Sequence, residues 1–395
     1  MSAPFLVGHA THPDWRGALA LAAAQIDGQR PEAATPLTLG FVYTSDHYAP
    51  YAKPIYAALR ERWPGVSWVG CVGVGVTASG VEYIDEPALV LMVCTLPVDH
   101  FQVYSGARKL ARDDLYAALV HADSSTPDLP ELITELSGRI ESGYLFGGLA
   151  SSRAASFHIA DGVWQGGLSG VAFTSDVALV SRVTQGCQPI GPTREVTACE
   201  RNLVLQLDGE PAMACLMRDL GIADLADPRQ AMPRLRATLV GLTDALDMAL
   251  GRAGQFGTDT RVRHLIGLDP PRLGVAVADV VQPGSRLAFC QRDAVAARRD
   301  LVRICSEIRE EMDSHADATS PPSAGATAPR AIAGAVYISC AGRGGPHFGG
   351  PSAEMKIVQH ALGDVPLVGF FAGGEIARRH LYGYTGVLTV FIAAD

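Results

Sequence analysis

Two stretches near the C-terminus decide the fold: Ile332-Ala-Gly-Ala-Val-Tyr-Ile-Ser-Cys-Ala-Gly-Arg-Gly-Gly345 and Val365-Pro-Leu-Val-Gly-Phe-Phe-Ala-Gly-Gly-Glu375. The apolar run 332–339 is rich in β-branched and aromatic residues, which predicts a buried strand. The glycines that follow let the backbone approach a neighbour closely. Apolar residues then recur at helical spacing up to Gly363, a residue type that often ends a helix. The predicted order is strand, glycine-rich loop, helix and second strand.

A similar unit occurs near the N-terminus. Gly40-Phe-Val-Tyr-Thr-Ser45 matches Gly334-Ala-Val-Tyr-Ile-Ser339 at four of six positions. Further on, Val66-Ser-Trp-Val-Gly70 has the spacing of Val365-Pro-Leu-Val-Gly369. Two matches in the same order predict an internal duplication of a strand-helix-strand unit. The alternative is that unrelated strand-helix-strand units share short apolar sequence segments by chance.

The rest of the chain predicts an α+β architecture of two domains, with mixed, largely antiparallel sheets flanked by helices. We expect helices at 108–120 and 129–141, and a longer helix at 293–312 whose apolar residues recur on one face. Residues 156–207 read as successive strands broken by glycines. The proline-punctuated segment that follows places the domain boundary between 1–207 and 208–395.

Low-complexity sequence fills residues 313–330, which contain Ser, Ala, Thr, Pro and Gly. Such a composition predicts a mobile loop. We place this loop inside the second domain, because the strand that it precedes is needed there.

Composition limits the classes of function. The chain has 395 residues, of which 48% are hydrophobic and 18% charged, as in a soluble globular protein. A net charge of −9 argues against nucleic acid as a partner. No apolar run approaches the roughly 20 residues of a membrane span, and the N-terminus lacks a secretory signal, so we expect a cytoplasmic protein. The eight cysteines include no Cys-x-x-Cys, which favours free thiols. We expect no metal and no cofactor.

Cys340 and Arg343 are the first candidate site residues. Cys340 lies where the predicted strand meets the loop, and a nearby guanidinium would lower the pKa of its thiol. Cys340 is either a ligand contact or a small core residue, and a nucleophilic role lacks a visible base. Glycines on both sides suggest that Arg343 lies at an exposed loop tip. It either binds a ligand carboxylate or forms an ion pair with Glu354.

The remaining candidates surround these two residues. Glu354 belongs to the first turn of the predicted helix, where the helix dipole stabilises a carboxylate. The N–H groups of that helix start and of Gly344 suit an anion. Glu375, after Gly374, either accepts hydrogen bonds from a ligand ammonium or caps a turn. In the first copy, Gly70 and Cys71 correspond to Gly369 and Phe370. The candidate ligand-binding residues are therefore Cys340, Arg343, Gly344, Glu354, Gly374, Glu375, Gly70 and Cys71.

These motifs resemble those of the FIST family, in which an N-terminal and a C-terminal FIST domain are paired. The resemblance spans most of the chain and rests on five stretches, which are Gly70-Cys71 with Gly73 and Gly75, Gln185–Gly191, Leu207–Ala212, Ser339–Arg343 and Val368–Glu375. It implies a sensory domain of signal transduction that binds small ligands, amino acids among them. Family members often carry a fused output domain. This chain has no residues left for one, so we expect a separate signalling partner.

The sequence therefore predicts a small-ligand-binding sensory protein of the FIST type. Its ligand would be a small carboxylate or an amino-acid-like metabolite, held by Arg343 and Glu375. The alternative is a cysteine-dependent enzyme that acts on a small amide or thioester through Cys340. No complete catalytic set of residues is visible, so we assign no catalytic residue.

Overall fold

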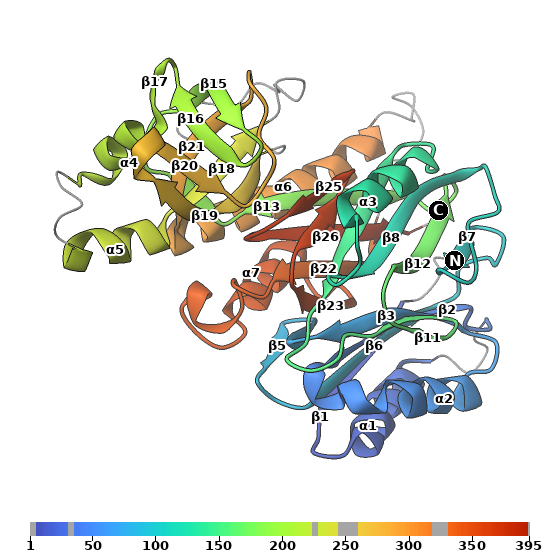
Figure 1. The fold of residues 1–395 in the computed structure, drawn as a ribbon. Coiled ribbons are helices and arrows are strands. Elements are labelled where there is room, and N and C mark those ends of the chain that lie inside the picture. The colour runs from blue at the N-terminus through green and yellow to red at the C-terminus, as the bar shows by residue number, and fades with distance from the viewer. Residues whose placement is uncertain (1–4, 31–34, 223–227, 244–259, 318–330, 394–395) are drawn as a thin grey trace. The chain divides into compact units, whose positions relative to one another are not determined.

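The computed structural model describes residues 5–30, 35–222, 228–243, 260–317 and 331–393 (Figure 1). Its contacts divide the chain into a larger unit, residues 1–184 with 298–395, and a smaller unit, residues 185–297. The smaller unit therefore interrupts the larger one in sequence. This division concerns spatial contacts, and the boundary between sequence domains at 207–208 stays a prediction.

In the described residues, the larger unit holds three six-stranded sheets. The first has the order β1-β6-β2-β3-β10-β11, with β1 at Leu6–Thr11, β6 at Ala88–Cys94, β2 at Leu39–Ser45, β3 at Ser67–Gly73, β10 at His158–Ala160 and β11 at Val163–Trp164. The second has the order β25-β24-β9-β8-β12-β7, with β25 at His380–Tyr382, β24 at Glu375–Ala377, β9 at Tyr144–Ala150, β8 at Leu115–Asp123, β12 at Leu168–Thr174 and β7 at Phe101–Tyr104. The third has the order β13-β26-β22-β23-β4-β5, with β13 at Leu179–Gln185, β26 at Thr385–Ile392, β22 at Ile332–Cys340, β23 at Leu367–Ala372, β4 at Gly75–Ala78 and β5 at Val81–Ile84.

The three sheets share one plan. Each is built on a parallel pair whose strands are joined by a helix, namely β2-α2-β3, β8-α3-β9 and β22-α7-β23, with α2 at Ala52–Arg62, α3 at Leu129–Gly138 and α7 at Ala353–Leu362. Antiparallel strands flank each pair on both sides. The predicted duplication is therefore confirmed, and the structure adds a third copy.

A glycine marks the same position in each parallel pair. A Cβ atom at Gly70, Gly147 or Gly369 would lie 1.7, 1.9 or 1.7 Å from the carbonyl oxygen of the partner strand. Only glycine fits such a close approach. The three positions can therefore be treated as equivalent, which aligns the repeats residue by residue.

Each repeat gives a hairpin to a neighbouring sheet. The hairpin β4-β5 follows β3 in the chain but pairs with β23 of the third sheet. In the same way β10-β11 pairs with β3, and β24-β25 pairs with β9. The exchange is cyclic, so none of the three sheets is complete without residues from another repeat.

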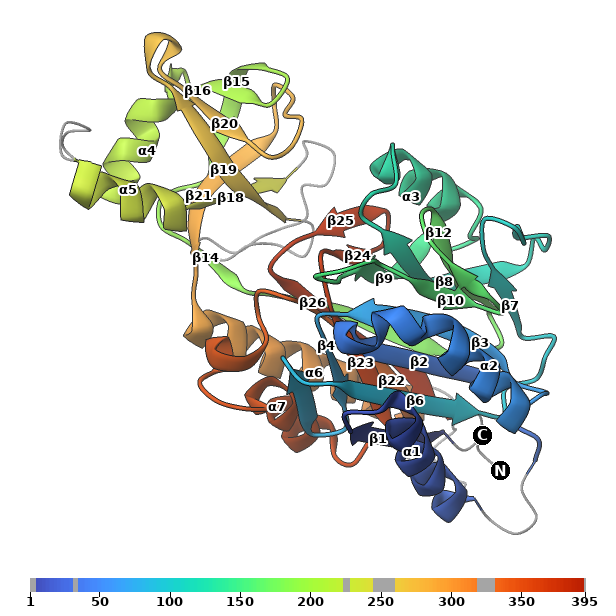
Figure 2. The same cartoon turned by 60° about the horizontal axis from the view of Figure 1, so that its bottom comes forward.

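One core lies between the inner faces of all three sheets. It includes Phe41 and Tyr43 of the first sheet, Phe146 of the second, and Ile338 and Phe370 of the third. Helices cover the outer faces. Figure 2 shows α1 (Trp15–Gln29) and α2 lying together over the first sheet, where their apolar residues form a second cluster with it.

The sequence predictions for two segments need correction. Residues 108–120 do not form a helix, because Leu115–Asp123 is β8, a central strand with neighbours on both sides. Residues 313–317 belong to α6, which spans Ala294–Asp317, rather than to the predicted loop. The rest of that loop, 318–330, lies outside the described residues. The long helix itself is confirmed, since Leu301, Cys305, Ile308 and Met312 are all buried.

In its described residues, the smaller unit is an antiparallel sheet with the two helices α4 and α5. The sheet has the order β14-β21-β15-β16-β20-β19-β18, with β17 paired to β16. The bounds are β14 Cys187–Pro189, β21 Arg286–Arg292, β15 Arg194–Glu200, β16 Leu203–Leu207, β20 Gly274–Val277, β19 Arg261–Asp269, β18 Leu239–Thr243, β17 Glu210–Pro211, α4 Ala212–Leu220 and α5 Pro228–Ala237. Short 3-10 helices lie at Asp46–Tyr51, Pro270–Arg272 and Gly345–Phe348. None of the helices in the described ranges is long and apolar enough to cross a membrane.

Candidate functional site

Arg343 and Glu354 form a buried ion pair behind the glycine-rich loop. Oε1 of Glu354 accepts hydrogen bonds from Nε of Arg343 at 3.1 Å and from Nη2 at 2.9 Å. The same carboxylate accepts from the hydroxyl groups of Tyr337 at 2.6 Å and Ser339 at 3.0 Å. Arg343 is 1% exposed and Glu354 is fully buried. The predicted exposed loop tip is therefore wrong, and the ion pair is the alternative that the structure shows.

A tight turn of the backbone directs the side chain of Arg343 into the interior of the protein. The N–H of Arg343 donates to the carbonyl of Cys340, the last residue of β22, at 2.8 Å. The guanidinium then lies 5.2 Å from the ring centroid of Phe348, so a cation–π contact adds to the ion pair. A Cβ at Gly344 would meet Ile84 and Phe371, which shows that this glycine permits close packing of the loop.

An internal carboxylate occupies the N-terminus of α7. Glu82 of β5 accepts hydrogen bonds from the N–H groups of Glu354 at 2.9 Å and Met355 at 3.1 Å. Burial raises the pKa of Glu82, although these backbone donors act to lower it. The anion position predicted at this helix start is thus real, but the protein fills it with a side chain from the first repeat.

Glu375 is fully buried at the start of β24. Its Oε2 accepts hydrogen bonds from the backbone N–H of Thr385 at 3.1 Å and from the hydroxyl of Thr385 at 2.7 Å. Its Oε1 has no hydrogen-bond partner among the residues that the structure describes. Burial raises the pKa of Glu375 to about 8, although Thr385, Arg343 and Cys340 each act to lower it. The carboxyl group is therefore mostly protonated at neutral pH.

Cys340 is partly exposed and lies close to both charged residues. Burial and the carboxylate of Glu375 raise the pKa of the thiol to about 12, and the weaker effect of Arg343 does not reverse this. The predicted lowering of the pKa is wrong, because desolvation outweighs the guanidinium. A thiol with this pKa is mostly protonated at pH 7, whereas a nucleophilic cysteine reacts as the thiolate.

The structure brings Cys340, Arg343, Glu354 and Glu375 into one group, which we call the C-terminal cluster. The pKa of Arg343 is raised by the charges of Glu354 and Glu375 among others, despite burial, so all three residues interact.

The remaining candidates, Gly374, Gly70 and Cys71, are not members of the C-terminal cluster. Gly374 adjoins the C-terminal cluster, and its carbonyl accepts the N–H of Leu149 at 2.8 Å. Gly70 and Cys71 belong to β3 of the first sheet. The Cys71 side chain is buried in the common core, where desolvation raises the pKa of its thiol well above the usual value.

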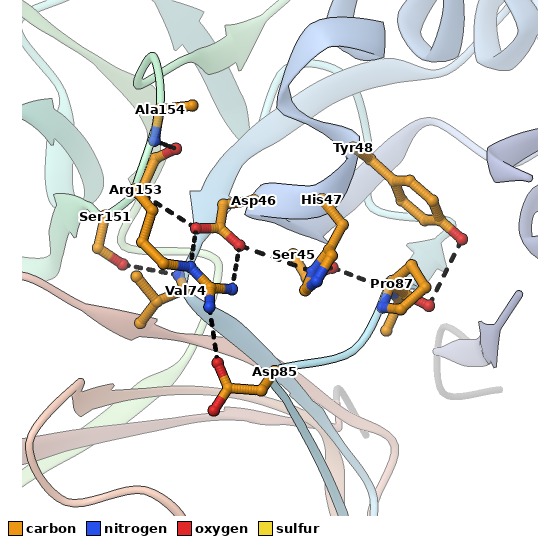
Figure 3. Close-up of polar contacts among 12 residues, drawn as sticks. Ser45, Asp46, His47, Tyr48, Val74, Asp85, Pro87, Ser151, Arg153 and Ala154 are labelled. Atoms are coloured by element: carbon orange, nitrogen blue, oxygen red, sulfur yellow. Dashed lines mark hydrogen bonds and ion pairs between the residues drawn. The ribbon is translucent and has the colours of Figure 1, made fainter. Parts of the chain in front are cut away.

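A second ionic group was not found from the sequence. Figure 3 shows Arg153 between Asp46 and Asp85. Arg153 donates to Asp46 from Nε at 2.8 Å and from Nη2 at 2.7 Å, and to Asp85 from Nη1 at 2.8 Å. Burial would raise the pKa of Asp46, but the hydrogen bonds and charge of Arg153 outweigh it and the pKa is lowered.

A serine close to this second group in the chain holds the turn that follows β3. Ser151, two residues before Arg153 in the chain, accepts the N–H of Val74 at 2.9 Å (Figure 3). It also donates to the carbonyl of Phe371. Asp46 and Arg153 are 107 positions apart, and no motif links them. The described residues contain no group of three His, Cys, Asp or Glu side chains that could hold a metal ion.

Comparison with known proteins agrees with this architecture. The FIST N domain model matches residues 38–210, and the FIST C domain model matches residues 212–378. The chain belongs to the FIST family. FIST domains are sensory domains of signal-transduction proteins, so the general function is sensory.

Relatives of this FIST protein occur in mycobacteria. An uncharacterized protein of Mycobacterium tuberculosis strain H37Rv is 29% identical over 407 residues, which cover 98% of this chain and 99% of the relative. An uncharacterized protein of Mycobacterium bovis is 30% identical over 412 residues, which cover 98% of each. The similarity therefore extends over both FIST domains.

Proposed function

We propose that this FIST protein senses a small, amino-acid-like metabolite that binds at the C-terminal cluster. One observation carries the proposal. Nη1 of Arg343 and Oε1 of Glu375 are buried polar atoms without a hydrogen-bond partner in the described residues. A buried polar group left unpaired costs about 1–3 kcal/mol, so a ligand that pairs both atoms gains a large part of its affinity there.

The cluster supports recognition of a carboxylate. Glu354 holds Nε and Nη2 of Arg343, and Phe348 lies against the guanidinium, so the direction of Nη1 is fixed before a ligand arrives. A donor that is already held in place loses little entropy on binding. The carboxylate of the ligand would take Nη1, and the partly exposed Cys340 would line the route to it.

Glu375 would contact the amine of the ligand. Its pKa of about 8 means that an ammonium ligand must displace a proton at neutral pH. Affinity for such a ligand should therefore rise with pH up to about 8 and then level off. A ligand with a carboxylate but no amine should not show this rise. Because only the protonated carboxyl of Glu375 can donate a hydrogen bond to it, its affinity should instead fall above about pH 8.

The test is a thermal-shift screen of amino acids and their deaminated analogues, followed by calorimetry from pH 6 to 9. A ligand at 100 times its Kd should stabilise the protein by about 2.7 kcal/mol. Glu375→Gln should remove the pH dependence of binding, whereas the exposed control Arg108→Ala should leave it unchanged. A screen without any stabilising compound, or a stabilising amino acid whose pH dependence of binding survives Glu375→Gln, would exclude the cluster as the sensor site.

A further inference from the structure

The larger unit contains a pocket that is lined by none of the four residues of the C-terminal cluster. It has a volume of about 400 Å³ and lies between β8 and β9 of the second sheet and β13 and β26 of the third. Its lining includes Ile392, which pairs with Ile332 at the start of β22, whereas Cys340 ends that nine-residue strand. A strand of this length spans roughly 30 Å, so this end of the pocket is far from Cys340. The other end reaches Phe146, which pairs with Ala377, two residues after Glu375, but no residue of the C-terminal cluster lines the pocket.

Comparison of the repeats explains why this space is open. The carbonyl oxygens that lie against Gly147 and Gly369 belong to Val120 and Tyr337. Ala117 of β8 and Gly334 of β22 each stand three residues before these partners, so the two positions are equivalent. At Gly334 the ring of Phe5, the residue before β1, fills the space, since a Cβ there would lie 2.5 Å from that ring. The residue before β13 is Ala178, and both Ala178 and Ala117 line the pocket. The small side chain of Ala178 therefore leaves open the space that the ring of Phe5 fills in the other repeat.

The walls of the pocket are mostly apolar. Phe146, Val177 and Val180 form part of them, together with the alanines. Ser181 and Thr389 also line it, and their hydroxyl groups are hydrogen-bonded to each other at 2.8 Å. Burial raises the pKa of Tyr144, another lining residue, so its phenol stays neutral. These hydroxyl groups can exchange hydrogen bonds with a ligand.

The charged residues at the pocket are already paired with each other. Nε of Arg182 lies 3.3 Å from the carboxylate of Glu307, and Nη2 contacts Glu311. Nη1 of Arg182 donates to the carbonyl of Ser181 at 3.0 Å. A charged ligand would have to break these contacts, whereas a neutral ligand would leave them intact.

We propose that this pocket binds a neutral small molecule with an aromatic or branched aliphatic body and one hydroxyl or amide group. The volume lies within the range of about 300–1,000 Å³ that is typical of small-molecule sites, and the walls combine apolar surface with a few hydroxyl groups. The site is independent of the proposed amino-acid site, and each can fail without the other.

The test uses 4-fluorobenzyl alcohol as the probe, with binding to the full chain followed by ¹⁹F NMR. The wild-type protein should broaden and shift the probe signal at millimolar concentration. Ala178→Phe reproduces the side chain that fills the equivalent space in the other repeat, and it should weaken binding at least tenfold. Val98→Phe, at a position 69% exposed, adds the same side chain elsewhere and should have no effect.

Three outcomes would overturn the proposal. They are no binding to the wild-type protein, unchanged binding to a folded Ala178→Phe variant, and tighter binding of 4-fluorobenzoate or 4-fluorobenzylamine than of the alcohol. If Ala178→Phe does not fold, Ala178→Leu serves as the second filling variant, with an expected loss of at least threefold.

Discussion

Arg343 and Glu354 are held inside the protein by several donors at once. The carboxylate of Glu354 accepts from the guanidinium, from Tyr337 and from Ser339, so burial leaves its charge well compensated. A buried pair of this kind contributes little net stability compared with apolar residues, but removal of one partner leaves a buried charge. The pair therefore specifies the position of the glycine-rich loop.

Arg343→Ala should lower the free energy of unfolding by about 3–5 kcal/mol, because Glu354 would lose its cation while remaining buried. Glu354→Gln should produce a comparable loss, since Arg343 would then be the uncompensated charge. Urea midpoints of both variants measure this. The exposed control Arg108→Ala should change stability by less than about 0.5 kcal/mol. A similarly small change in Arg343→Ala would mean that the side chain is not buried in an ion pair.

Glu375 should make the protein less stable as pH rises from about 5 to 8. The pKa of Glu375 is about 8 in the folded protein, whereas an ordinary glutamate, as in the unfolded chain, has a pKa of 4.5. Between these two values the folded state holds a proton that the unfolded state has released. The slope attributable to one such group is at most about 1.4 kcal/mol per pH unit. Chemical denaturation across this range measures it. Glu375→Gln should flatten the profile, and a profile identical to the wild type would contradict the raised pKa.

At the scale of single elements, α7 depends on a residue from another repeat. Its first turn includes Glu354, and its backbone N–H groups donate to Glu82, which lies 272 positions earlier than Glu354. A carboxylate at this place satisfies donors that a helix leaves unpaired at its start, and it interacts favourably with the helix dipole. The hairpin β4-β5 thus both extends the third sheet and caps its helix.

Glu82→Ala should cost about 0.5–2 kcal/mol of stability, the usual effect of a lost N-terminal cap. Hydrogen exchange should show faster exchange of the Glu354 and Met355 amides, with the helix α2 unchanged. Glu61→Ala, an exposed position on α2, is the matched control. Equal protection of the two amides in Glu82→Ala and in the wild type would show that the cap does not hold the helix.

The elements that could be predicted from sequence are those with local signals. The unit β22-α7-β23 and its first copy were found because Gly40–Ser45 and Gly334–Ser339 share residues at matching spacing. In the structure, however, Val42 pairs with Gly70 and Tyr337 with Gly369, so these two segments are one residue out of register. The third copy was missed, because residues 108–120 contain the alanines and leucines that favour a helix. Pairing of β8 with β9 and β12 on its two sides overrides that preference.

The candidate site follows the same rule. Cys340, Arg343 and Glu354 lie close together in sequence, so their grouping could be predicted, and so could the ion-pair alternative. The burial of Arg343 could not, because it depends on Phe348, Tyr337 and the packing of the loop. The partner of the helix start could not be predicted either, since Glu82 is brought there only by the exchange of hairpins.

At the scale of the whole molecule, the cyclic exchange of hairpins ties three repeats into one larger unit. The first sheet needs β10-β11 of the second repeat, the second needs β24-β25 of the third, and the third needs β4-β5 of the first. Loss of one repeat would leave a sheet edge unpaired in one neighbour and would leave the hairpin of the other neighbour without its sheet. The larger unit should therefore unfold as one cooperative structure.

Thiol labelling in increasing urea, read by mass spectrometry, can test this cooperativity. The buried residues Cys94 of β6 and Cys305 of α6, the helix that precedes the third repeat in the chain, both belong to the larger unit, and they should become reactive at the same midpoint. Cys215 and Cys290 belong to the smaller unit and are free to follow a midpoint of their own. Reaction of Cys305 at a clearly lower urea concentration than Cys94 would show that parts of the larger unit unfold separately.

The hairpin exchange also has a consequence for synthesis on the ribosome. Ala78 of β4 pairs with Val368 of β23, which leaves the ribosome 290 residues later. At about 5–20 residues per second, the hairpin waits for roughly 15–60 seconds before its partner exists. During that time its strand edges can pair with other chains. Expression of this protein should therefore depend on chaperones that shield nascent strands, and variants truncated before β23 should aggregate.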